Sequence, residues 1–420
     1  MGFKGKALRA TLPLALALTL TGCLVENDLL IRTPVSAFYA YDNGIKTLTK
    51  QHLLRGRYLL FSERANSVQQ AAFDLRERRY VWRTKIFPDD RIYYLAQNNK
   101  RAYAWPFEYR PGQLVVIDPE TGEIPARLLN DQLETGAHAT EFSGLVASED
   151  RVYAITDRSG VAVFELDEEG LPTFVRKIVI PDIERMTTPT RGQLFYAMSI
   201  AMDPETQDVF VGSSSAISYG DIPDLYRIDG DTGEILWKAQ VEYPDDGEDA
   251  TAGRFAGYVS AITLAGDMLI VQAGQSVQAF DPETGERYWY YELRCMGTTP
   301  GGLTQSQLYV PETGRVYFGR GSMTCFYSVA AGVEGPDPWT LDTERYAYGA
   351  TPQEGLPTYM DGVLYFFNGF LWAVDPYTGR PLSVSENLEG SGWRISIFND
   401  GRYVYVPAHD GIYVFEPVEE

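Results

Sequence analysis

A five-residue pattern, Asp-x-x-Thr-Gly, recurs four times in this chain, each time directly after a short apolar segment. The Asp side chain can cap a tight turn and the Gly accepts a positive φ, so each copy predicts the corner of a β-hairpin. A chain that repeats one hairpin is expected to fold by repeating one β unit. The residues that define the four copies are Asp118, Thr121, Gly122, Asp229, Thr232, Gly233, Asp281, Thr284, Gly285, Asp375, Thr378 and Gly379.

A tryptophan follows two of these corners at a fixed spacing. Trp237 and Trp289 each lie eight residues after the Asp, and Trp82 keeps that spacing from Asp74 without the Thr-Gly. We expect each Trp to begin the returning strand and to pack on a neighbouring sheet. The motif is structural, and nothing in it requires catalysis.

A series of short apolar strands recurs at the same period as the Asp-x-x-Thr-Gly corners, and together they give the length of the repeat. Each strand is followed within about thirty residues by another that ends near one of eight anchors. From Asp74 to Glu416 is 342 residues in seven steps, about 49 per step. Four strands with their turns fit that length, which is that of a propeller blade. The short strands are 58–61, 92–95, 152–155, 209–211, 269–271, 316–318, 363–366 and 403–406.

These repeats predict an all-β fold, an eight-bladed β-propeller of four-stranded antiparallel blades over residues 46–420. The 28 Tyr, 20 Phe and 39 Gly favour strands and turns, and even the most helix-like stretch, 64–75, is expected to be loop and strand. The last anchor, Glu416, leaves no room for a fourth strand in blade eight. Either 29–31 or 37–41 is expected to supply that strand and close the ring, which removes an open sheet edge.

The first residues have the character of an export signal. A basic start precedes an apolar run from Leu12 to Leu20, which is too short to span a bilayer comfortably. Leu20-Thr21-Gly22-Cys23 then resembles the lipobox of bacterial lipoproteins, in which the Cys is lipidated and becomes the first mature residue. The alternative is an ordinary secretory signal with an incidental Cys.

The lipobox divides the N-terminal region. We expect residues 1–22 to be the lipoprotein signal peptide and residues 23–45 to be the lipidated tether with the ring-closing strand. Two or more acyl chains on Cys23 would anchor the chain stably. Leu24, where an Asp would favour retention in the inner membrane, favours the outer membrane on its periplasmic side, with exposure on the cell surface as the alternative.

The net charge of the chain limits the classes of partner that it can bind. The chain has 36 Lys and Arg against 57 Asp and Glu, a net charge of −21, and loses three more positive charges with residues 1–22. This argues against nucleic acid, and against an anionic lipid surface, as the main partner. The membrane is expected to be reached through the lipid on Cys23, by a propeller that is monomeric.

Two further cysteines, Cys295 and Cys325, remain. In an exported protein such a pair is expected to form a disulfide, and the alternative is two unrelated buried thiols. Cys295 lies before the first strand of blade six and Cys325 begins its third. Because the first and third strands run in the same direction, both Cys are expected at one rim of the ring, where a bridge is feasible.

The full repeat, with Ala279, Asp281, Thr284, Gly285 and Trp289, resembles the tryptophan-docking repeat of the pyrroloquinoline-quinone (PQQ)-like β-propellers. That family contains PQQ-dependent alcohol dehydrogenases. It also contains non-enzymatic, BamB-like lipoproteins of outer-membrane β-barrel assembly. The resemblance to the second group implies no cofactor, and envelope proteins, among them the assembly machinery, as partners.

The resemblance to the dehydrogenases is in the repeat only. Those enzymes are usually longer and hold PQQ with calcium, a catalytic Asp and often a disulfide between adjacent cysteines. This sequence has no adjacent Cys pair and no residue that can be named as the base. A PQQ- or other ligand-binding enzyme therefore stays the alternative, and no catalytic, cofactor-binding or metal-binding residue is assigned.

Other chemistry-bearing residues favour plain structural interpretations. Asp229 and Asp231 could begin a calcium loop, but no acidic series follows, so a solvated turn is expected. The acidic loop 245–249 could meet a cation or a basic partner. The three His (52, 138 and 409) fall in distant blades, and Ser213–Ser215 lacks a nucleophile elbow.

Aromatic clusters at 103–109 and 288–291 are expected to pack between blades. If exposed, they would mark a peptide or sugar surface. The leading hypothesis is a lipid-anchored β-propeller that acts as a protein-interaction scaffold in the bacterial envelope, in outer-membrane β-barrel assembly. A surface glycan- or peptide-binding lipoprotein is a further alternative.

Overall fold

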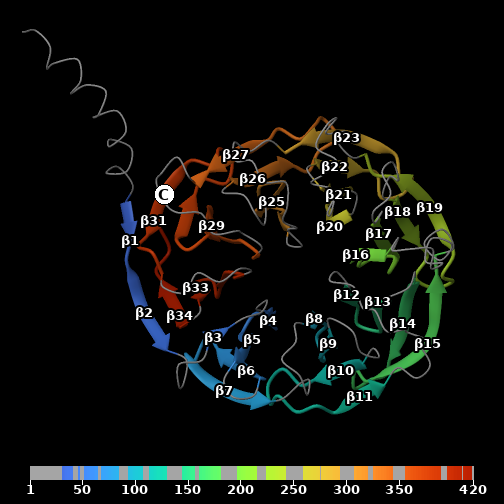
Figure 1. Cartoon of the computed structure of the whole chain (residues 1–420), viewed down its shortest axis with the longest axis horizontal. Helices are drawn as coiled ribbons and strands as arrows, with labels where there is room; N and C mark the ends of the chain where they lie inside the picture. Colours follow the sequence, from blue (N-terminus) through green and yellow to red (C-terminus); the bar gives the residue numbers. More distant parts are fainter. Residues whose placement is uncertain are drawn as a thin grey trace, which may run out of the picture.

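The computed structural model describes a ring of eight β-sheets, with the N-terminal strands beside the C-terminal ones (Figure 1). Its described residues form strands and turns, with no α-helix among them. No helix in this described part is long and apolar enough to cross a membrane. The described residues are 31–40, 46–47, 52–64, 68–84, 93–106, 113–129, 144–156, 160–180, 196–214, 224–242, 259–274, 276–293, 307–319, 325–343, 355–388, 395–408 and 410–418.

Each sheet is one blade, and apart from the N-terminal strands its strands follow the chain and pair antiparallel. Blade one holds β3 (Lys46–Thr47), β4 (His52–Leu54), β5 (Tyr58–Arg64), β6 (Val68–Asp74) and β7 (Arg79–Thr84). Blade two holds β8 (Tyr93–Gln97), β9 (Ala102–Pro106), β10 (Gln113–Ile117) and β11 (Ala126–Leu129). Blade three holds β12 (Leu145–Ala147), β13 (Arg151–Thr156), β14 (Gly160–Leu166) and β15 (Pro172–Val179). Blade four holds β16 (Tyr196–Met202), β17 (Val209–Ser214), β18 (Asp224–Ile228) and β19 (Ile235–Gln240).

The second half of the ring repeats this plan. Blade five holds β20 (Val259–Ala265), β21 (Met268–Ala273), β22 (Ser276–Phe280) and β23 (Arg287–Glu292). Blade six holds β24 (Leu308–Val310), β25 (Arg315–Gly319), β26 (Cys325–Ala330) and β27 (Trp339–Asp342). Blade seven holds β28 (Thr358–Met360), β29 (Val363–Phe367), β30 (Leu371–Val374) and β31 (Pro381–Ser385). Blade eight holds β32 (Phe398–Asn399), β33 (Val404–Pro407) and β34 (Gly411–Phe415). The predicted eight-bladed, all-β propeller is confirmed.

An N-terminal strand closes the ring, as predicted. Strand β2 (Val35–Ala40) pairs antiparallel with β34 and so becomes the outer strand of blade eight. Of the two candidate segments, the one at 37–41 therefore completes the blade. The other contributes β1 (Ile31–Thr33), which adds a fifth, parallel strand to the outer edge of blade seven beside β31.

In two blades the order of the strands differs from the sequence prediction. The segment at 92–95 belongs to the same predicted series as 152–155 and 209–211, which are second strands, but it falls on β8, the first strand of blade two, and β9 is the second. In blade one, both β3 and β4 pair with β5, so the first strand is made in two pieces. Apolar alternation identifies a strand but does not give its place within the blade.

The apolar core lies between blades rather than within any one sheet. Strands β18, β22 and β29 are buried along their whole length, because both faces of a blade pack on neighbours. Seven clusters of buried side chains join blade to blade around the whole ring. One of them joins Phe73 of blade one to Tyr405 of blade eight across the closure. Each blade is therefore held by its two neighbours.

Candidate protein-interaction surface

The predicted hairpin corners form one series of turns, each joining the third and fourth strands of a blade. In the copy at Asp229, the Oδ1 atom accepts hydrogen bonds from the backbone N–H of Asp231 at 2.9 Å and of Thr232 at 2.6 Å. The N–H of Gly233 donates to the Asp229 carbonyl at 2.9 Å. The other three copies repeat this pattern. The Asp therefore caps the turn, as predicted.

The tryptophans lock these turns to the blade before them. The indole N–H of Trp237 in blade four donates to the carbonyl oxygen of Pro282 in blade five at 2.9 Å. Trp82 donates in the same way to Pro119 at 3.0 Å, and Trp289 to Gly332 at 2.8 Å. A side chain at Gly122 or Gly285 would overlap the docked Trp ring, which explains why the turn needs Gly for space as well as for its positive φ.

A second set of latches, made by tyrosines of the second strands, was not predicted. Tyr103 donates its hydroxyl to the Gly170 carbonyl in the next blade at 3.0 Å, and Tyr317 to Pro376 at 3.1 Å. Burial raises the pKa of both hydroxyls to about 12, so each stays a neutral donor. A recurring Tyr in the short strands could have indicated these hydrogen bonds, but with 28 Tyr in the chain its recurrence is not distinctive.

Two further features were not predicted from the sequence: one docked tryptophan and one turn. Trp339 of blade six donates to Pro376 at 2.9 Å, although no Asp-x-x-Thr-Gly precedes it. A fifth copy of the turn joins the first and second strands of blade four; it begins at Asp203, whose Oδ1 accepts the Glu205 N–H at 2.8 Å, with Gln207 at φ +62° in place of the Gly. The shared Asp-Pro-Glu-Thr run could have revealed it.

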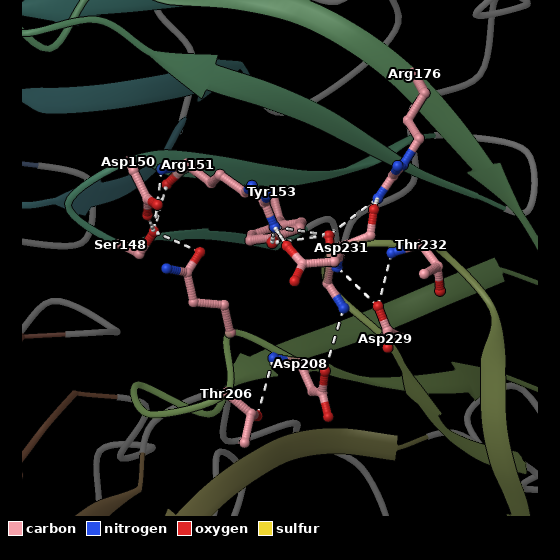
Figure 2. Close-up of polar contacts among 12 residues, drawn as sticks. Ser148, Asp150, Arg151, Tyr153, Arg176, Thr206, Asp208, Asp229, Asp231 and Thr232 are labelled. Carbon is pink, nitrogen blue, oxygen red and sulfur yellow. Dashed lines mark hydrogen bonds and ion pairs between the residues drawn. The ribbon is translucent and has the colours of Figure 1, made fainter.

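The junction of blades three and four carries a polar network, which Figure 2 shows. Arg151, Tyr153 and Arg176 of blade three converge on the turn of blade four (Figure 2). The Gly230 carbonyl accepts hydrogen bonds from Arg151 Nη1 and Arg176 Nη2, both at 3.0 Å, and from the Tyr153 hydroxyl at 3.4 Å. Arg151 also pairs with the Asp231 carboxylate at 2.6 Å. Three donors on one carbonyl fix this turn in place.

The other side of the same turn is fixed by blade four itself. The Gly230 N–H donates to Asp208 Oδ1 at 3.2 Å, and the Asp208 carboxylate is paired with buried Arg227 at 2.8 Å. A Cβ at Gly230 would overlap the backbone of Gln207. The turn therefore presents a rigid, preorganised surface, which lowers the entropy cost of binding a partner.

Exposed apolar side chains lie beside this network on the outer strands. Val175 and Val179 of β15 are 43% and 39% exposed, and Ile235 and Leu236 of β19 are 38% and 47% exposed. Acidic side chains on the adjoining corners are exposed as well, among them Glu149, Asp150, Glu205 and Glu234. We call this set, β15, β19 and the corners between them, the junction surface. Its apolar centre and acidic rim suit a protein partner with apolar and basic groups.

The remaining sequence candidates form no chemical site in the described part of the chain. Asp229 is occupied by backbone N–H groups, which lower the pKa of its carboxyl, and Asp231 by Arg151, so the calcium-loop alternative gains no support. Ser213 is buried and its hydroxyl accepts the Asp224 N–H at 2.8 Å, a structural role. Among the described residues, no three His, Cys, Asp or Glu side chains converge as metal ligands. His138, His409, Ser215 and the acidic loop 245–249 lie outside those residues.

The aromatic cluster at 103–109 packs inside the ring where it is described. Tyr103 and Trp105 are buried between blades two and three, as expected, and Phe107 and Tyr109 lie outside the described residues. In the second cluster Trp289 is buried, whereas Tyr288 is 40% exposed and donates its hydroxyl to Asp281 at 2.6 Å.

Of the three cysteines, only Cys325 lies among the described residues. Cys325 begins β26, the third strand of blade six, where it is buried. Cys295 lies outside the described residues, so its pairing with Cys325 stays a prediction. Cys23 and the signal peptide lie outside them too.

Comparison with known proteins confirms the resemblance to the PQQ-like propellers. The sequence model of the family described as outer membrane protein assembly factor BamB matches residues 185–333. No curated protein sequence matches this chain.

Solved structures share the fold at low sequence identity. BamB from Moraxella catarrhalis is 15% identical, with a TM-score of 0.59 over 92% of this chain and 100% of its own. The quinohemoprotein alcohol dehydrogenase from Comamonas testosteroni is 14% identical, with a TM-score of 0.61 over 91% of this chain and 76% of its own. A europium-containing methanol dehydrogenase is 14% identical, with a TM-score of 0.56 over 90% and 85% of the two chains. At these identities the likeness establishes the propeller fold alone.

Proposed function

We propose that this chain is a lipid-anchored scaffold of the bacterial envelope that binds other proteins through the junction surface, and that it serves the assembly of outer-membrane β-barrel proteins. The observation that carries the proposal is the match of residues 185–333 to the BamB family model. That segment includes the Gly230 turn and β19, which form half of the junction surface.

The geometry of the junction surface supports a binding role. Its turn is held by three donors from the neighbouring blade, so it needs little ordering when a partner arrives. The exposed apolar residues of β15 and β19 provide area to bury, and the acidic rim favours basic partners at low salt.

The lipobox and Leu24 support an outer-membrane location on the periplasmic side. We propose that the anchor is the acylated Cys23 and that the ring itself has no enzymatic activity. Neither the sequence nor the described residues offer a set of side chains for catalysis, and the likeness to dehydrogenases extends to the fold only.

Co-purification tests the proposal. The chain would carry a C-terminal tag, be extracted from membranes in mild detergent, and have its partners identified by mass spectrometry. We expect a β-barrel assembly protein at near-stoichiometric yield. A Cys23→Ala variant controls for anchoring, because it should leave the membrane fraction.

A matched pair of surface variants assigns the contact. Ile235→Ser with Leu236→Ser alters the junction surface, whereas Val333→Ser with Tyr377→Ser removes apolar groups that are even more exposed from blades six and seven. We expect at least a tenfold loss of partner with the first pair and none with the second. Equal recovery with both pairs would place the contact elsewhere.

The quinoprotein alternative has its own test. Stoichiometric PQQ binding with calcium, together with quinone-dependent alcohol oxidation, would replace the scaffold proposal by an enzyme. Among the described residues no three His, Cys, Asp or Glu side chains are grouped as a cation site.

A further inference from the structure

Charge is distributed very unevenly around the ring. Blade one, residues 46–84, holds nine Lys and Arg against three Asp and Glu. Blade four, residues 196–240, holds two against eight, and blade five, residues 259–292, holds one against five. Blade one is therefore strongly basic in a chain whose net charge is −21, and the acidic blades lie across the ring from it (Figure 1).

The basic side chains of blade one are exposed at its rim. Arg55, Arg76, Arg79 and Arg83 are exposed, and Arg57 is half-buried. Some carry local partners, since Arg79 pairs with Glu77 at 2.5 Å and Arg57 with Asp74 at the same distance. These two acids do not balance the arginines of the blade, so a net positive surface remains.

Blade eight extends this basic surface across the closure. Arg78 lies 4.2 Å from the ring centroid of Tyr403, and Arg402 lies 5.1 Å from the same ring. Hydrogen bonds to Tyr403 and Tyr39 raise the pKa of Arg78 above its ordinary value, so it stays charged. We call Arg76, Arg78, Arg79, Arg83 and Arg402 the arginine edge.

The arginine edge lies next to the strands that lead to the N-terminal segment. Tyr39, on β2, packs against Phe73 of blade one at 5.3 Å between ring centroids. The next strand back, β1, begins at Ile31, eight residues after Cys23. Strand β1 lies on the outer edge of blade seven, and eight residues span at most about 29 Å, so an acylated Cys23 would hold blade seven, and with it the neighbouring blade eight of the arginine edge, close to the bilayer.

We infer that the arginine edge binds the anionic headgroups of the bilayer in which the chain is anchored, and so sets the orientation of the ring. This inference rests on the lipid anchor of the proposed function and goes beyond it. The acidic blades do not cancel the attraction, because charges on the far side of the ring lie beyond a Debye length of about 8 Å. The net charge of the whole chain argues against binding to an anionic surface, but blade one has a net positive charge.

Binding to vesicles tests the inference without the anchor. A chain that begins at Leu24 keeps every described strand of the ring. It would be sedimented with vesicles of phosphatidylglycerol and phosphatidylethanolamine, and with vesicles of phosphatidylcholine alone. We expect binding to the anionic vesicles only, and its loss at high salt. One charge near such a surface is worth about fivefold in binding.

Two charge-matched variants give the decisive comparison. The first is Arg76→Glu, Arg79→Glu and Arg402→Glu, on the arginine edge. The second, Lys177→Glu, Lys238→Glu and Arg287→Glu, makes the same change in net charge on blades three to five. We expect at least a tenfold loss of vesicle binding for the first and less than twofold for the second, with both folded by circular dichroism.

Other outcomes overturn the inference. Equal losses for both variants would mean that only net charge matters. Binding to polyglutamate but not to vesicles would assign the arginine edge to an acidic protein, and binding to neither would leave it no anionic ligand. Recovery of the assembly partner through the junction surface is a separate measurement, so failure here leaves the proposed function standing, and the converse also holds.

Discussion

Gly285 has no room for a side chain, because the ring of Trp237 lies where its Cβ would be, with the nearest ring carbon 2.8 Å away. The two residues belong to different blades, and the Trp237 indole also donates to the turn that contains Gly285. The corner motif and the tryptophan are therefore two halves of one contact between blades.

Substitution of Gly285 should test that contact. Gly285 has φ +73° and Gly401 has φ +78°, but a Cβ at Gly401 meets nothing within 4 Å. Gly401→Ala should cost about 1 kcal/mol from backbone strain, and Gly285→Ala about 2–4 kcal/mol because overpacking is added. Denaturant unfolding measures both, and equal costs would show that the ring does not fill that space.

Tyr317 and Trp339 should be coupled through one acceptor. Both donate to the Pro376 carbonyl, at 3.1 and 2.9 Å. Each of Tyr317→Phe and Trp339→Phe should cost about 1 kcal/mol for the lost hydrogen bond. In a double-mutant cycle the pair should cost more than the two singles together, since only then is the buried carbonyl left without a donor. Strict additivity of the two free energies would contradict this.

Alkaline pH should destabilise the ring through its buried tyrosines. Burial raises the pKa of Tyr103 from 10.0 to about 12, so its contribution is complete below pH 10 and is lost as pH rises towards 12. The unfolded chain loses its phenolic proton first, and the loss approaches about 3 kcal/mol per tyrosine. Unfolding free energies at pH 9 and pH 11 measure it. Tyr103→Phe should reduce the slope, and an unchanged slope would argue against the latch.

Reduction should weaken the chain if Cys295 and Cys325 are bridged. A loop of about 30 residues is worth roughly 3–4 kcal/mol. Intact mass before and after alkylation counts the thiols, and a reductant should lower the melting temperature. Cys325→Ala should be as unstable as the reduced chain. Two alkylated thiols in the native, unreduced chain would rule the bridge out.

The sequence predicts the ring well because the fold is periodic. Apolar strands and Asp-x-x-Thr-Gly corners repeat about every 49 residues, and the missing fourth strand of blade eight follows from where the last repeat ends. The closure by Val35–Ala40 was predicted as one of two choices, because both segments are apolar and only packing selects between them.

What the sequence did not reveal depends on contacts between distant segments. Trp339 docks without the motif because blade six closes its corner differently, through Arg315 and Asp337 at 3.0 Å. The Asp203 turn was missed because Gln207 stands where Gly was expected. The junction surface and the arginine edge each join corners of neighbouring blades, and no local pattern shows which corners meet.

The pairing of β2 with β34 has a consequence for how the protein is made. Strand β2, which is made early, pairs with β34 (Gly411–Phe415), the last strand of the described ring. During synthesis β2 must wait unpaired until the other strands of blade eight have been made. Ring closure therefore depends on β34, and a chain cut short before that strand should keep an open sheet edge and be degraded more readily by proteases.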